Sequence, residues 1–170
     1  MENIEFESFD NIENDDSGRL YEMGKSYYDS GSDILAEKYL KEAAKGGNRK
    51  AFLLLADIYL KYDKLNLAEK YLKKIADGGD FELQDKLGTV YKRKSNFELA
   101  EYYYKQAISN GNQRAQYHLG KLYYLFKKKN LAIDYLKPVA DERDQEAQVL
   151  LAKIYYDNGQ VDLAEEYLHK

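Results

Sequence analysis

The sequence contains no cysteine and only two histidines among its 170 residues. Without cysteine the chain has no disulfide and no thiolate chemistry. His118 and His169 are the only imidazole groups, so we predict no zinc or other metal site and no cofactor. For His118, which falls on a predicted helix, we expect a structural or solvent-exposed role.

Long hydrophobic runs are also missing. No stretch approaches the ~18 uninterrupted apolar residues that a membrane helix needs. The first ten residues are acidic, whereas a signal peptide starts with a basic segment and continues with an apolar one. From these two features we expect a cytoplasmic protein with no membrane partner.

The sequence shows no catalytic constellation. The glycine pair Gly46-Gly47 does not follow a predicted strand and no Gly-Lys-Ser/Thr sequence comes after it, so it is not a phosphate-binding loop. Carboxylates alternate with lysines at helical spacing, as at Glu37 and Lys41, which is typical of a solvated helix face. We therefore expect that the protein is not an enzyme.

A spacing of 32 residues runs through the chain. It is shared by five tyrosines and five alanines: Tyr27, Tyr59, Tyr91, Tyr123 and Tyr155, and Ala36, Ala68, Ala100, Ala132 and Ala164. Five copies of one sequence unit predict an all-α protein of five 32-residue helix-turn-helix repeats, with about ten antiparallel helices. The expected repeats are residues 17–48, 49–80, 81–112, 113–144 and 145–170.

Each predicted repeat has the same internal pattern. The first helix carries a small residue three positions before its tyrosine, as at Gly88 and Tyr91, and the second helix repeats this with Ala68 and Tyr71. Residues three and four apart share a helix face, and a small residue on that face lets the neighbouring helix approach closely. The repeated small residues are therefore predicted to be structural.

Polar residues and glycines mark the predicted helix ends. Residues able to cap a helix N-terminus precede each first helix: Asp16, Asn48, Asp80, Asn112 and Asp144. Three of them follow a glycine suited to a left-handed helix end: Gly47, Gly79 and Gly111. We expect the first two helices at about 17–30 and 33–46, and the others at steps of 32 residues.

The fourth repeat departs from the pattern at two positions. Pro138, the only proline, stands inside a predicted helix, where its ring should clash with the carbonyl of Asp134 and kink the helix. Arg143 stands where other repeats have glycine, so we expect a different turn there.

The spacing of Gly88, Ala100 and Tyr104 resembles that of tetratricopeptide repeats, and the segment 107–112 resembles Sel1-like repeats. The resemblance covers about residues 17–170. It implies a right-handed α-solenoid and an adaptor role, without naming a partner. The 32-residue period is shorter than the usual tetratricopeptide unit of about 34 residues.

Side chains that do not recur form a line along each first helix, offset from the packing face. In the families that the chain resembles, the first helices line the concave side, so this line is the candidate binding groove. Exposed tyrosines beside cations are typical of protein-binding hot spots. The alternative is that repeat stacking buries part of the line. The predicted partner-binding residues are Tyr21, Lys25, Tyr28, Leu53, Leu60, Lys92, Arg93, Tyr117, Lys121, Tyr124, Lys153 and Tyr156.

The leading functional hypothesis is a non-enzymatic adaptor or scaffold that binds a protein or peptide, acidic or aromatic in character, in this groove. A chaperone-like or toxin-immunity-type protein that sequesters one cognate partner is the first alternative. The second is a nucleic-acid binder, whose affinity would fall steeply with salt. The net charge of −4 argues against this second alternative.

The two ends of the chain differ in character. Residues 1–16 contain seven acidic and no basic residues, which predicts a flexible arm ahead of a single repeat domain at 17–170. The arm either occupies the basic groove or is disordered. At the other end Leu163, Tyr167 and Leu168 are predicted to be exposed, so we expect self-association through this edge.

Overall fold

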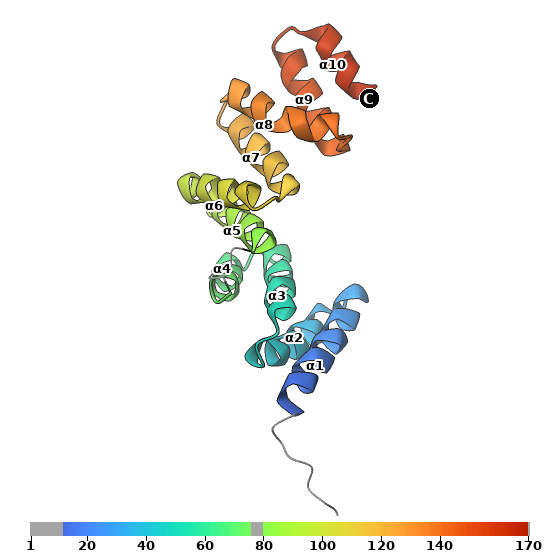
Figure 1. Ribbon diagram of the computed structural model, residues 1–170, viewed down its shortest axis with the longest axis vertical. Helices are drawn as coiled ribbons and strands as arrows, with labels where there is room; N and C mark the ends of the chain where they lie inside the picture. Colours follow the sequence, from blue (N-terminus) through green and yellow to red (C-terminus); the bar gives the residue numbers. More distant parts are fainter. Residues whose placement is uncertain (1–11, 76–79, 170) are drawn as a thin grey trace, which may run out of the picture. The chain divides into compact units, whose positions relative to one another are not determined.

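The computed structural model describes the backbone of residues 12–75 and 80–169, and the side chains of these residues from Asp16 onward. This part of the chain forms ten α-helices and no strand. They are α1 (Ile12–Asp29), α2 (Asp33–Lys45), α3 (Arg49–Lys61), α4 (Leu65–Lys73), α5 (Phe81–Arg93), α6 (Phe97–Ser109), α7 (Gln113–Leu125), α8 (Lys129–Asp141), α9 (Gln145–Asp157) and α10 (Val161–Leu168) (Figure 1). None of these helices is long and apolar enough to cross a membrane.

The chain divides into two compact units, unit 1 (residues 1–77) and unit 2 (residues 78–170). In unit 1, α1 packs on α2, α2 on α3, and α3 on α4. In unit 2 each helix from α5 to α10 likewise packs on the next, and the helix pairs can be followed in Figure 1. The predicted all-α fold of repeated helix pairs is confirmed.

Close approach of the paired helices depends on the small residues. A Cβ atom added to Gly88 would lie 2.5 Å from the ring of Tyr104 on α6, and one added to Gly24 would lie 2.7 Å from Cγ of Leu40 on α2. Between α5 and α6, the helices of Gly88 and Tyr104, the rings of Tyr91 and Tyr103 also stack, with centroids 5.4 Å apart. The predicted structural role of the repeated small residues is confirmed, and the repeated tyrosines pack beside them.

Four of the five predicted N-caps are confirmed, because their side chains accept hydrogen bonds from N–H groups in the first turn of the next helix: Asn48, Asp80, Asn112 and Asp144. The prediction for Asp16 is wrong, because α1 begins at Ile12 and Asp16 lies inside it. Residues 12–16 are thus helical where an arm was expected. The acidic residues that suggested an arm are also favourable in the first turn of a helix, where they face the positive end of the dipole. The rest of the arm lies outside the described residues.

The turn before α9 has the same left-handed backbone as the turns before α3 and α7, so the prediction of a different turn is wrong. Arg143 adopts a φ of 69°, and its N–H donates to the carbonyl of Ala140 at 3.1 Å. Gly47, with a φ of 82°, donates to Ala44 at the same distance. Packing of α8 and α9 therefore holds an arginine in a conformation that favours glycine. α8 is assigned as one helix that includes Pro138, and the kink stays a prediction.

Candidate functional site

The predicted groove residues all lie on first helices. In unit 1 they lie on α1 and α3, and in unit 2 on α5, α7 and α9. Their exposure varies: Lys25, Arg93, Lys121, Lys153 and Tyr156 are exposed, Tyr21, Tyr28, Leu53, Leu60, Lys92 and Tyr124 are half-buried, and Tyr117 is buried. Stacking of the repeats therefore buries part of the line. The residues of unit 2 come together most clearly, and they are described first.

Tyr117 is not an exposed anchor, contrary to the sequence-based expectation. Its side chain is only 9 % exposed, because α9 packs on α7 and α8 at this position. The ammonium group of Lys121 lies 5.5 Å from the centre of the Tyr117 ring and donates to its hydroxyl at 3.4 Å. Tyr117 thus supports Lys121 and offers little area of its own to a partner.

Three cations gather where the last turn of α5 meets α7. Burial lowers the pKa of Lys92, and the nearby charges of Lys121 and Arg93 lower it further, whereas Asp85 acts in the opposite direction. Lys92 and Arg93 also lie at the negative end of the α5 dipole, which favours cations there. The cluster Lys92, Arg93 and Lys121, called the cationic cluster below, is therefore a place where an added carboxylate would be stabilised.

Asp85 is the carboxylate whose charge opposes the lowering of the Lys92 pKa, and its side chain already contacts His118. Asp85 Oδ1 lies 2.7 Å from Nδ1 of His118, which joins α5 to α7. The His118 ring also packs against the ring of Tyr104, whose hydroxyl is 3.2 Å from Thr89 Oγ1 and whose pKa is raised by burial. His118 thus has a structural role, one of the two that were expected, and the sequence pattern did not indicate its pairing with Asp85.

An open cavity of about 440 Å³ lies between α7 and α9 beside Lys121. Its lining combines apolar and cationic groups with one carboxylate: Tyr117, Lys121, Gln145, Glu146, Val149, Leu150 and Lys153. The ammonium group of Lys153 lies 5.7 Å from the centre of the Tyr124 ring. Unit 2 therefore places apolar contact area on α9 next to the cationic cluster of α5 and α7.

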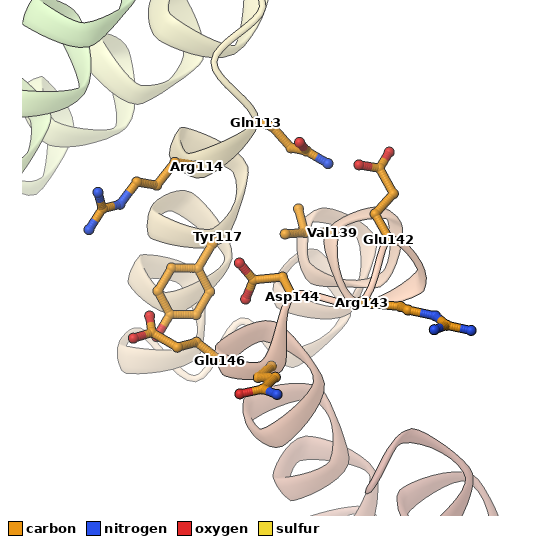
Figure 2. Close-up of a pocket in the computed structure, with 9 residues that line it drawn as sticks. Gln113, Arg114, Tyr117, Val139, Glu142, Arg143, Asp144 and Glu146 are labelled. Carbon is orange, nitrogen blue, oxygen red and sulfur yellow. The ribbon is translucent and has the colours of Figure 1, made fainter. Parts of the chain in front are cut away.

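A second cavity of unit 2, about 600 Å³, lies where the turn between α8 and α9 meets the start of α7 (Figure 2). The sequence pattern did not predict this cavity, although Arg143 in place of glycine marked the turn that lines it as unusual. Figure 2 shows Arg114 and Arg143 on opposite sides of the cavity with the Asp144 carboxylate between them. Glu142 and Glu146 also line it, so charges of both signs are spread around it and no single anion or cation is favoured.

Unit 1 has a cavity at the equivalent place in its own repeats. It measures about 470 Å³ and includes Tyr21, which precedes Tyr117 by three repeats of 32 residues. The charged residues of its lining are Glu22, Arg49 and Lys50.

Within residues 12–75 and 80–169, no group of three histidine or carboxylate side chains is placed to hold a metal ion.

Comparisons with known proteins agree with the repeat fold. The model of the tetratricopeptide repeat family matches residues 145–170. The PilF protein of Pseudomonas aeruginosa is similar in structure with a TM-score of 0.81 and 17 % identity, over 92 % of this chain and 75 % of that one. A MamA protein has a TM-score of 0.74 and 21 % identity, over 92 % of this chain and 90 % of that one. No curated protein sequence matches.

A chain from the APC/C hetero-tetramer Cut9-Hcn1 is also similar, with a TM-score of 0.75 and 21 % identity over 90 % of this chain. The present chain spans only 32 % of that chain's length. Identities this low establish the fold and leave the resemblance to Sel1-like repeats a prediction. The chain therefore has the fold of tetratricopeptide repeat proteins, and its last repeat, residues 145–170, matches the sequence model of that family.

Proposed function

We propose that the chain is a non-catalytic protein-interaction module that binds an acidic segment of a partner protein across α5, α7 and α9 of unit 2. The observation that carries the proposal is the cationic cluster of Lys92, Arg93 and Lys121. Burial and the charges of Lys121 and Arg93 lower the pKa of Lys92, and a bound carboxylate would relieve that repulsion.

The neighbouring cavity adds the apolar part of the site. Val149 is 60 % exposed and lies beside Lys121 and Lys153 in the cavity lining. A partner segment that carries both carboxylates and an aromatic side chain can therefore make charged contacts to α5 and α7 and bury its ring against α9. Glu146, which also lines the cavity, disfavours a carboxylate at that end and so orients the segment.

The fold supports a binding role. The Cut9-Hcn1 structure is that of a hetero-tetramer, so a chain with this fold takes part in a protein assembly. For the present chain the site consists of Lys92, Arg93, Lys121, Tyr124 and Lys153. The proposal assigns the first-helix residues of unit 1 no contact with this segment.

A direct test uses a labelled synthetic peptide with the sequence of residues 2–10, which contains four carboxylates and two phenylalanines. We expect binding to the 170-residue chain by fluorescence anisotropy, weakening as salt is added. The double variant Lys92→Glu, Lys121→Glu should bind at least about tenfold more weakly. Lys137→Glu, an exposed lysine on α8, is the control with the same type of charge change.

Two outcomes would overturn the proposal. One is that the double variant binds the peptide as tightly as the Lys137→Glu control does. The other is that a peptide with glutamine and asparagine in place of the glutamates and aspartate binds as tightly as the original peptide, because binding would then not depend on charge.

A tyrosine pair separates binding from stability. Tyr123 is 4 % exposed, packs on Tyr135 and donates to Glu101 at 2.9 Å, so Tyr123→Ala should lower the melting temperature. Tyr124 is half-buried on the binding side, so Tyr124→Ala should weaken peptide binding and leave melting nearly unchanged. Identical behaviour of the two variants would show that Tyr124 belongs to the core.

A further inference from the structure

An exposed surface that is both apolar and basic lies where the α5–α6 turn meets the α7–α8 turn in unit 2. The rings of Phe97 and Phe126 pack edge to face with centroids 4.3 Å apart, which brings the two turns together. These residues are still 37 % and 41 % exposed, and Leu125, next to Phe126 in the chain, is 61 % exposed. The surface stays exposed although a further repeat, α9 and α10, follows it. It is called the turn surface below and consists of Phe97, Leu125, Phe126, Lys127, Lys128 and Lys129.

The three consecutive lysines make the turn surface positively charged. They line a hollow of about 380 Å³ together with Asn130 and Leu131. Lys129 donates to Oδ1 of Asn158 at 2.8 Å, whereas the ammonium group of Lys127 has no hydrogen bond or ion pair with any described residue. The segments that form the two turns, 94–99 and 125–131, hold four lysines and a single carboxylate. An anionic partner would therefore be attracted to this place.

The backbone of the α7–α8 turn gives no reason for a lysine. Lys127 has a φ of 57°, in the left-handed region, and Gly159 serves the same turn of the next repeat with a φ of 75°. A residue with a side chain is strained there, and glycine is not. The cation at this tip is therefore not explained by the stability of the turn.

The fold does not require the exposed apolar residues either. In unit 1, 64 residues earlier, Lys61 and Tyr62 stand at the positions of Leu125 and Phe126, and both donate to the buried carboxylate of Asp33. The same joint can thus be closed by polar contacts. In unit 2 it leaves large apolar side chains exposed beside lysines, a combination that is typical of an interaction surface.

We propose that the turn surface binds the headgroup region of a lipid bilayer that contains anionic lipids. Binding of this kind gains from apolar side chains that enter the boundary between headgroups and acyl chains, and from lysines near the anionic headgroups. Leu125 and Phe126 supply the first contribution, and Lys127 and Lys128 supply the second. The expectation of no membrane partner rested partly on the lack of a spanning helix, and contact with the lipid surface needs no such helix.

The opposite ends of the same helices suit this orientation. The α6–α7 and α8–α9 turns, residues 109–112 and 141–146, contain four carboxylates, one arginine and no large apolar residue. With 13 residues each, α7 and α8 are about 20 Å long, which is more than two Debye lengths at physiological ionic strength. The acidic ends therefore face away from an anionic bilayer without cancelling its attraction for the lysines.

A nucleic-acid strand fits the turn surface less well. Binding of single strands relies on exposed rings on which the bases stack. The rings of Phe97 and Phe126 pack against each other, and Leu125, the most exposed apolar member, has no ring. The apolar part of the surface therefore favours lipid.

The test is co-sedimentation of the 170-residue chain with vesicles. One set consists of phosphatidylcholine alone, and the other of equal parts of phosphatidylcholine and phosphatidylserine. We expect binding to the phosphatidylserine vesicles only, weakening as salt is added. Leu125→Gln should weaken this binding, because it removes an apolar side chain and no charge.

Lys127→Gly separates a binding role from a structural one. Removing the cation should weaken vesicle binding about fivefold. The same change relieves the left-handed strain, so the melting temperature should stay the same or rise. A loss of binding caused by poor folding would instead come with a lower melting temperature.

Two variants serve as matched controls. Lys50→Glu changes an exposed lysine at the start of α3 and is compared with Lys127→Glu, which should bind the vesicles at least about tenfold more weakly. Phe81→Gln removes a side chain that is 48 % exposed at the start of α5, and it is compared with Leu125→Gln. Neither control residue belongs to the turn surface, so both controls should bind as the unchanged chain does.

The proposal does not rest on the peptide site. The Lys92→Glu, Lys121→Glu variant should lose the peptide and keep the vesicles, and Lys127→Glu should do the reverse. Failure of one proposal can thus be told apart from failure of the other.

Three outcomes would overturn lipid binding. The first is no binding to the phosphatidylserine vesicles, or equal binding to both kinds of vesicle. The second is that Lys127→Glu binds the vesicles as well as Lys50→Glu does. The third is that a single-stranded oligonucleotide binds in a way that Lys127→Glu weakens and displaces the vesicles, because the surface would then be a nucleic-acid site.

Discussion

The joint between the two repeats of unit 1 and the first joint of unit 2 use different chemistry at the same place. In unit 1, Asp33 at the start of α2 is buried and accepts hydrogen bonds from Lys61 and, at 2.8 Å, from the hydroxyl of Tyr62. Two repeats later, in unit 2, the positions of Asp33 and Tyr62 are held by Phe97 and Phe126, whose rings meet edge to face with centroids 4.3 Å apart. A charged contact and an aromatic contact thus serve one backbone geometry.

The same contrast occurs where the helices of one repeat cross. In unit 1 a flexible leucine, Leu40, packs over Gly24, whereas in the first repeat of unit 2 the rigid ring of Tyr104 packs over Gly88. The next repeat of unit 2 again has a leucine, Leu136, over its glycine, Gly120. The repeated backbone fixes which positions touch, and the side chains at those positions can be exchanged. Differences between the units should therefore appear in how each responds to substitution, and four substitutions test this from the largest expected effect to the smallest.

Gly88→Ala should have the largest effect. The added Cβ would lie 2.5 Å from the ring of Tyr104, which cannot fold away and is held by Thr89, so we expect a loss of ~2 kcal/mol in unfolding free energy. Gly24→Ala, against Leu40, should cost about half as much, because the leucine can change rotamer. Chemical denaturation of both variants measures the difference. Equal costs would mean that the partner side chain is unimportant.

Phe126→Ala should destabilise unit 2 by ~1.5 kcal/mol. The side chain is 41 % exposed, so its removal loses only part of the burial of a core phenylalanine, together with the edge-to-face contact to Phe97. Raising the salt concentration should leave this loss unchanged, because no charge takes part. Salt-dependent denaturation of the variant checks it, and a strong salt effect would contradict the aromatic account.

Arg143→Gly should stabilise unit 2 by ~1 kcal/mol. Arg143 has a φ of 69° in the turn for which unit 1 uses Gly47, and a residue with a side chain is strained there. The reverse change, Gly47→Arg, should destabilise unit 1 by a similar amount. Both are read from denaturation midpoints, and a loss of stability in Arg143→Gly would show that contacts of the arginine outweigh the strain.

Asp33→Asn should have the smallest effect, a loss of stability that is present at neutral pH and disappears at low pH. Hydrogen bonds from Lys61 and then Tyr62 lower the pKa of Asp33 below its ordinary value of 3.8, against the opposing effect of burial. A carboxyl with a lowered pKa stabilises the fold above its unfolded pKa, and this stabilisation is lost as the pH falls through the folded pKa.

Amide exchange of α2 and α3 in unit 1 should therefore speed up as the pH falls below about 4, relative to the intrinsic rate. In Asp33→Asn this extra acid sensitivity should disappear, and the Phe97–Phe126 contact of unit 2 should show no counterpart. The same acid sensitivity in the variant would assign it to other carboxyl groups.

The sequence predicts the features that repeat or are local. The period of 32 residues places the helices, and the caps at Asn48 and Asp144 follow from residue type and position alone. The burial of Tyr117 could not be predicted in this way, because it depends on how closely α9 packs over α7. The residues of the cationic cluster were predicted, but the lowered pKa of Lys92 and the Asp85–His118 pair depend on the distance between α5 and α7.

Two predictions failed because one local rule outweighed another. Glycine preference predicted an altered turn at Arg143, yet packing of α8 and α9 imposes the common backbone. Charge predicted an arm up to residue 16, yet acidic residues are compatible with a helix start, and α1 begins at Ile12.

The central claim is that the cationic cluster on α5 and α7 binds an acidic segment. It is tested most directly by following amide chemical shifts of the labelled 170-residue chain while the peptide with the sequence of residues 2–10 is added. The account predicts saturable shifts around Lys92, Lys121 and Lys153, and none of that size on helices α6 and α8. Shifts centred on α6 and α8, or no saturable shift around Lys92 and Lys121, would contradict it.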